Sequence, residues 1–95
     1  MGVDNLIIEY LSARSIKQNA IHNQQYEVAA NSRDDERRLS VEIFNTLHPN
    51  DNYNSYNNCD EAIDEYCLKK YNLSIYDNIC LKSIIRYQKL KELGI

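Results

Sequence analysis

The sequence has little glycine and proline and no tryptophan. Its 95 residues include two Gly, both near the ends of the chain, and one Pro. A β-rich domain of this length needs turn residues along its whole length, so their scarcity favours helices. The chain also has too little interior for a second core, so we expect a single domain over residues 1–95. With 43% hydrophobic and 26% charged residues, that domain is expected to be globular.

The chain also lacks a basic excess and a long apolar run. Its net charge is −3 and its sequence pI is about 5.3, which argues against general coating of nucleic acid by counterion release. The apolar run 6–8 is too short for a signal peptide or a membrane span. We therefore expect a cytoplasmic protein that does not enter a membrane.

Catalytic and metal-binding patterns are missing as well. The three cysteines, Cys59, Cys67 and Cys80, fit neither a disulfide framework nor a zinc motif, and we interpret them as buried reduced thiols. The two histidines, His22 and His48, lie in no recognisable nucleophile context. No glycine-rich phosphate loop is present. The sequence thus predicts a protein that is not an enzyme, with no cofactor and no metal.

Three possible helix caps divide the chain. Ser32 precedes Asp35, Asn58 precedes Glu61 and Ser74 precedes Asp77, each by the three residues of a capping box. Apolar residues at helical spacing follow each pair. The predicted helices are about 3–30, 33–47, 59–71 and 75–93, with an Asn-rich loop at 48–58. The polar stretch 18–25 leaves open a bend near 19–23, which would give five helices.

The last predicted helix has apolar residues over more than half of its circumference. Such a helix is either central to a bundle or shared with another subunit. We therefore expect an all-α bundle of four helices, or five, with the C-terminal helix at its centre.

Aromatic content favours an interaction role. Eight Tyr and one Phe offer surface that combines apolar contact with hydrogen bonding. The sequence predicts a regulator, inhibitor or adaptor that binds another protein and forms a homodimer. Its Asn, Ile, Tyr and Lys usage is typical of A/T-biased phage or virulence-associated DNA. The predicted protein-binding residues are Tyr10, Arg14, Tyr26, Tyr53, Tyr56, Asp60, Glu61, Asp64 and Glu65.

A DNA-binding regulator is the alternative. The last two predicted helices are joined tightly, as in a helix-turn-helix, and four basic residues less Glu92 give +3 from residue 78 onward. Against this, the second helix of the pair begins with the apolar and acidic run 75–77. The two hypotheses differ in where the basic residues lie. DNA binding requires them on one exposed face, whereas the protein-binding hypothesis expects them spread around a buried helix with only their charged tips in water. The candidate DNA-binding residues are Lys82, Arg86, Lys89 and Lys91.

Overall fold

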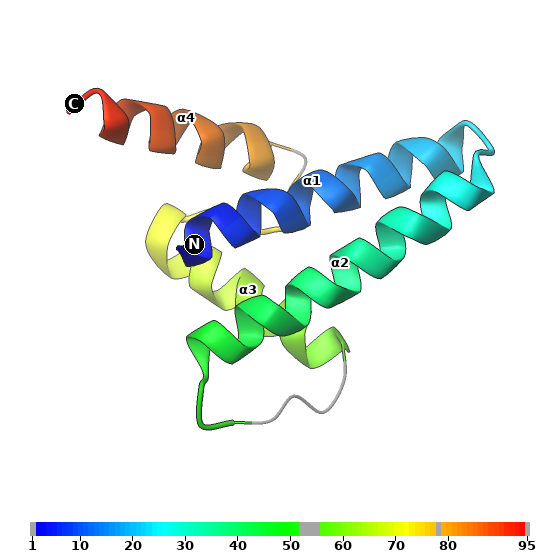
Figure 1. The fold of residues 1–95 in the computed structure, drawn as a ribbon. Helices are drawn as coiled ribbons and strands as arrows, with labels where there is room; N and C mark the ends of the chain where they lie inside the picture. The colour runs from blue at the N-terminus through cyan, green and yellow to red at the C-terminus, as the bar shows by residue number, and fades with distance from the viewer. Residues whose placement is uncertain (1, 52–55, 78, 95) are drawn as a thin grey trace.

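The computed structural model describes residues 2–51, 56–77 and 79–94, and these form four helices. The helices are α1 (Val3–His22), α2 (Tyr26–Leu47), α3 (Tyr56–Tyr71) and α4 (Cys80–Glu92). Within those ranges no residue lies in a strand. The predicted all-α bundle of four helices is therefore confirmed (Figure 1).

The first two helices form a long antiparallel hairpin. Both helices bury small residues, among them Ala13, Ala20, Ala29 and Ser32, and small side chains let helix axes approach closely. The ammonium of Lys17 pairs with the carboxylate of the buried Glu36 at 2.7 Å. The end of the hairpin that carries the α1–α2 turn extends beyond both α3 and α4 (Figure 1).

The other half of the hairpin contains the hydrophobic core. There α3 packs against α2, and α4 packs against α1. All four helices and the α3–α4 connection contribute to one buried apolar cluster. Its members are Leu6, Ile7, Tyr10, Leu11, Leu39, Ile43, Ile63, Cys67, Ile75, Cys80 and Ile84.

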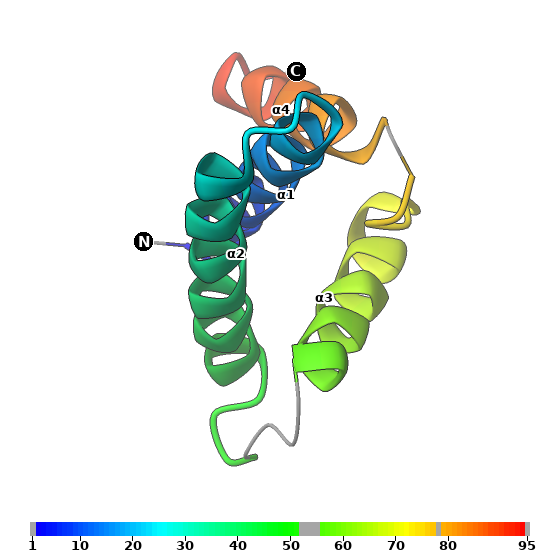
Figure 2. The same ribbon diagram turned by 90° about the vertical axis from the view of Figure 1, so that its right-hand side faces the viewer.

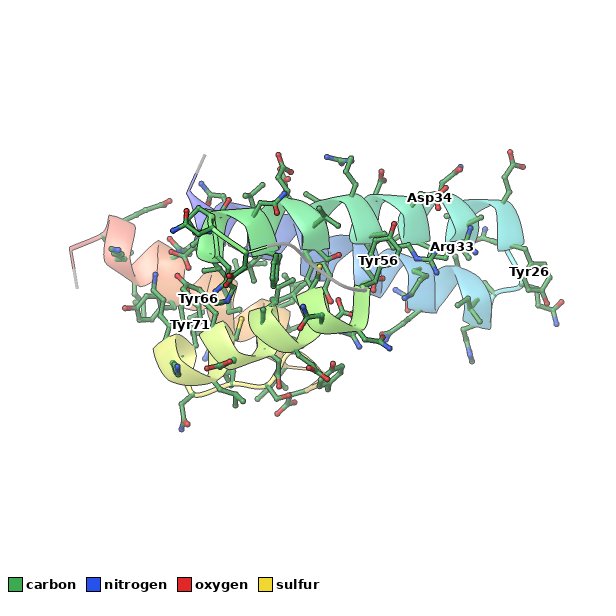
Figure 3. All side chains as sticks on the ribbon, turned by 90° about the horizontal axis from the view of Figure 1, so that it is seen from below. Tyr26, Arg33, Asp34, Tyr56, Tyr66 and Tyr71 are labelled. Atoms are coloured by element: carbon green, nitrogen blue, oxygen red, sulfur yellow. The ribbon has the colours of Figure 1, made fainter. Side chains whose placement is uncertain are left out.

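The carboxylate of Asp4 ties the start of α1 to the end of α3. It accepts hydrogen bonds from the hydroxyls of Tyr66 and Tyr71 at 2.9 and 2.7 Å and from the Lys70 ammonium at 2.6 Å. The two tyrosines lie near each other on α3 (Figure 3). Burial raises the pKa of Asp4, but these three donors outweigh it, so the pKa is lowered. The network fixes where α3 lies on the hairpin.

The predicted boundary between the first two helices is wrong. α1 ends at His22, and Gln24 turns the chain with a left-handed φ of 61°. The chain does bend in this region, but at residues 23–25 instead of across the expected 19–23, and the bend separates α1 from α2. Ser32 and Asp35 lie inside α2, where Ser32 is buried, so Ser32 is not a cap.

The other two predicted caps also fail. Asn58 lies within α3, which begins two residues earlier at Tyr56. Ser74 begins a turn instead of a helix, because its hydroxyl donates to Asp64 and accepts the Tyr76 N–H. α4 begins only at Cys80, so the predicted span 75–93 is too long at both ends.

The prediction that the C-terminal helix is central is wrong. α4 lies at the edge of the bundle, beside α1 (Figures 1 and 2). Only Cys80 and Ile84 of α4 are buried. The flanking Ile79 and Leu93 are 55% and 73% exposed. Much of the apolar surface that suggested a central helix is uncovered.

Among the described residues, no helix is both long and apolar enough to cross a membrane.

Candidate interaction surface on α4

The outward face of α4 carries a shallow, open apolar groove with basic residues along it. The groove has a volume of about 300 Å³ and is lined by Lys82, Ile85, Arg86, Lys89 and Leu90. These positions are three or four residues apart along the helix, so they share one side of it. Ile85 is half-buried, whereas Leu90 and the three basic residues are exposed.

Three of the four predicted basic residues therefore lie together on an exposed face. Lys91 is exposed too, but it does not line this groove. The charge of this region contrasts with the rest of the chain. Residues 80–95 sum to +3, from four basic residues less Glu92, so the remaining residues carry −6 of the total −3.

A second groove adjoins the first. Its volume is about 310 Å³, and it lies between α1 and the segment that connects α3 to α4. Arg14 and Lys82 both line it. The Arg14 guanidinium stacks over the ring of Tyr76, 4.8 Å from its centroid. Arg14 and Lys82, which the sequence assigned to two different functions, thus contribute to one surface.

Sequence reasoning missed the polar lining of this second groove. Gln18 and Asn19 border it, but the sequence suggested only a polar stretch at which the helix bends. No local signal identifies their role, because the opposite wall of the groove comes from residues 75–77 and 80–82, far along the chain.

Tyr10 was predicted as an exposed binding residue, and this is wrong. Its side chain is fully buried, and its hydroxyl donates to Oδ1 of Asp60 at 2.6 Å. Burial, together with the Asp60 carboxylate, raises the pKa of the Tyr10 hydroxyl above its usual range. Tyr10 connects α1 to α3 and is not available to a partner.

Of the four acidic residues on α3 that were predicted to bind a partner, two are engaged within the protein and two are exposed. Asp60 is engaged by Tyr10, and Oδ1 of Asp64 accepts from the Ser74 hydroxyl at 3.0 Å and from the Ile75 N–H at 2.9 Å. Glu61 and Glu65 remain exposed. Glu65 pairs with Lys69 at 2.9 Å, and this contact lowers its pKa.

The remaining predicted tyrosines lie away from α4. Tyr26 is 67% exposed at the far end of the hairpin (Figure 3). Tyr56 begins α3, and the Arg37 guanidinium lies 5.1 Å from its ring centroid. Tyr53 lies outside the described residues. The predicted protein-binding residues therefore do not form one continuous surface.

In the described part of the chain, no group of three or more His, Cys, Asp or Glu residues could hold a metal ion. Cys59, Cys67 and Cys80 are free and buried. Burial raises the pKa of the Cys67 thiol to about 12.

No protein family model, no curated protein and no solved structure matches the chain.

Proposed function

We propose that this protein is a non-enzymatic interaction module whose α4 groove binds an acidic helical segment of another protein. The observation that carries the proposal is the exposed groove itself, where Ile85 and Leu90 lie among Lys82, Arg86 and Lys89. An amphipathic partner helix presents apolar anchors every three or four residues, which matches this spacing. Acidic residues flanking those anchors would meet the basic residues along the groove.

The basic residues along this groove disfavour its binding to the same groove on a second copy of the chain. A symmetric contact would bring the two sets of basic residues together, and like charges across an interface are unfavourable. An acidic partner gains from the same charges, mainly in its association rate and its specificity.

The length of α4 limits the size of the contact. Thirteen residues at about 1.5 Å each give a helix of about 20 Å. A surface of this length belongs to the small, transient class of interfaces, below about 1,200 Å². Reversible regulation or adaptor binding fits such a surface better than a permanent complex.

The test uses a synthetic acidic peptide with Leu at helical spacing and Glu between, labelled for fluorescence anisotropy. A scrambled peptide of the same composition, which cannot form one apolar face, is the first control. We expect saturable binding of the patterned peptide and much weaker binding of the scrambled one. Equal binding of both would contradict the proposal, because charge alone would then explain it.

Two charge reversals provide the matched pair of variants. Arg86→Glu and Lys91→Glu change the net charge equally, and both residues are exposed on α4, but only Arg86 lines the groove. We expect Arg86→Glu to weaken peptide binding at least about tenfold, as for loss of a close charge pair. Lys91→Glu should have a small effect. If both variants weaken binding equally, the groove is not the site.

DNA binding is the second candidate, favoured by the exposure of Lys82, Arg86 and Lys89 on one side of α4. If these three residues contact phosphates, the logarithm of the binding constant should fall with the logarithm of salt concentration with a slope of about −2.7. A duplex that binds more tightly than the acidic peptide, with this slope, would favour the DNA candidate over the proposal.

A further inference from the structure

The groove between α1 and the α3–α4 connection contains an incompletely satisfied cation. Nη1 of Arg14 is buried and has no hydrogen-bond acceptor among residues 2–51, 56–77 and 79–94. A buried donor without an acceptor is costly, and such groups often mark a place where a ligand or ion binds.

Stacking on Tyr76 does not supply that acceptor. The ring covers one face of the Arg14 guanidinium at 4.8 Å, whereas the N–H donors of a guanidinium point outward in its plane. The stack instead holds the group in one orientation, which reduces the entropy lost when an anion binds.

The carboxylates of the neighbouring segments already have partners. Asp60 accepts from Tyr10, Asp64 from Ser74, and Oδ1 of Asp77 from the Ile79 N–H at 3.2 Å. In the part of the chain that the structure describes, Arg14 makes no ion pair. None of these carboxylates forms an ion pair with Arg14 in the described residues, so a bound ligand can supply the acceptor.

We infer that this groove binds a carboxylate, which Arg14 and Lys82 hold together. The inference extends the proposed function, because Lys82 also lines the α4 groove, so the carboxylate would be an aspartate or glutamate of the same partner. Arg pairs with a carboxylate through two parallel hydrogen bonds, and Lys82 adds a second positive charge.

The rest of the lining favours a monoanion on an aliphatic stem, as in a glutamate side chain. Leu11, Ile75 and Leu81 provide apolar surface, and Asp77 also borders the groove. A carboxylate tolerates this nearby negative charge better than a doubly charged phosphate does. The volume of about 310 Å³ is at the lower end of the roughly 300–1,000 Å³ typical of ligand pockets.

The probe is isovalerate, a carboxylate on the branched stem of a leucine side chain. Proton–nitrogen correlation NMR of the Arg14 side chain measures its binding. Isovaleramide, which has the same shape and no charge, is the matched control. So small a ligand is expected to bind with a Kd of roughly 1 mM. As the isovalerate concentration is raised to about ten times this Kd, we expect the Arg14 and Tyr76 signals to shift and then saturate. Equal shifts with isovaleramide, or no shift with isovalerate, would overturn the inference. Inorganic phosphate that binds more tightly than isovalerate would overturn the assignment to carboxylates.

Two variants locate the site. Arg14→Gln should weaken isovalerate binding about tenfold or more, as expected for loss of a charge-assisted pair. If Arg14→Gln does not fold, Lys82→Gln serves in its place, because Lys82 is exposed and its replacement should not disturb folding. Lys82→Gln should weaken isovalerate binding several-fold. Unchanged affinity in the folded variant would contradict the inference.

The two proposals can fail separately. If isovalerate binds but the acidic peptide does not, the carboxylate site stands and the proposed function fails. If the peptide binds to wild type and Arg14→Gln equally, the function stands and the carboxylate site fails.

Discussion

The hydroxyl of Tyr10 donates to Oδ1 of Asp60 at 2.6 Å, which joins α1 to α3 across 50 residues of sequence. The Tyr10 ring is at the same time part of the apolar core. One side chain therefore connects two helices both by packing and by a charge-assisted hydrogen bond, which is stronger than a neutral one.

Replacing Tyr10 with Phe tests this hydrogen bond alone, because the ring stays in place. We expect the free energy of unfolding to fall by about 1.5–3 kcal/mol, the usual contribution of a hydrogen bond to a charged group. Urea unfolding followed by circular dichroism measures it. Tyr26→Phe is the control, since Tyr26 is 67% exposed, and it should change stability by less than about 0.5 kcal/mol. A Tyr10→Phe variant as stable as wild type would show that the hydrogen bond contributes nothing net.

The Asp4 network predicts how stability depends on pH. The pKa of Asp4 is lowered in the folded state from its ordinary value of 3.8, so folding favours the ionised carboxylate. Its contribution is therefore fully present above the unfolded pKa and is lost as pH falls through the folded pKa. We expect Asp4→Asn to cost about 1–3 kcal/mol at pH 7, and progressively less below about pH 4.

Urea unfolding of wild type and Asp4→Asn at neutral and acid pH measures this difference. Asp51→Asn is a suitable control, because Asp51 is exposed and its one ion-pair contact, to His48, is long at 3.9 Å. A destabilisation by Asp4→Asn that does not change with pH would contradict the role of the charge.

The number of helices, the start of α1 and the ends of α2 and α3 could be predicted from the sequence, but the starts of α2, α3 and α4 could not. Ser32 and Asp35 match a capping box, yet no residue between Tyr26 and Leu47 interrupts the helical pattern, and Ser32 is buried against α1. The true break depends on Gln24 at a φ of 61°, where glycine or asparagine would be the recognisable residues.

Long-range contacts explain the failures at the site. Ser74 and Ile75 bond to Asp64 on α3, and this holds residues 74–77 in a turn where the local sequence favours a helix. Tyr10 continues the buried apolar stripe of Leu6, Ile7 and Leu11, so helical spacing alone indicates its burial. Only its hydrogen-bond partner Asp60, 50 residues away, required the fold. The basic residues of α4 were recognised from sequence, but their grouping with Arg14 required the fold.

Because the three cysteines are buried, we expect their thiols to react slowly with alkylating reagents. All are buried, and burial raises the pKa of Cys67 to about 12, so very little reactive thiolate is present near pH 8. We expect alkylation by iodoacetamide in the folded protein to be roughly 10³-fold slower than for a free thiol, because it must await local or global unfolding. Mass spectrometry counts the modified residues with time. Thr46 is exposed, so the thiol added by Thr46→Cys should react at the rate of a free thiol. If the three native thiols react as fast as the added one, the interpretation of the cysteines as buried thiols would be contradicted.

Self-association stays a prediction, and the hairpin offers a surface for it. On one side of the hairpin a groove of about 390 Å³ is lined by Ile8, Ile16 and Leu39, with Glu9, Asp35 and Arg38 at its edges. A surface with charges of both signs can pair unlike charges with its own copy across a two-fold axis. The α4 groove, with only basic residues along it, cannot.

Sedimentation equilibrium at micromolar concentration tests whether a dimer forms through this groove. Ile16 and Ile21 are 51% and 53% exposed on α1, but only Ile16 lines the groove, so Ile16→Glu and Ile21→Glu form a matched pair. Losing the burial of one isoleucine costs about 2 kcal/mol, so Ile16→Glu should weaken the dimer about 30-fold or more. Ile21→Glu should leave it intact. A strictly monomeric wild-type protein would make the homodimer prediction wrong, whereas a dimer equally sensitive to both variants would place the interface elsewhere on α1.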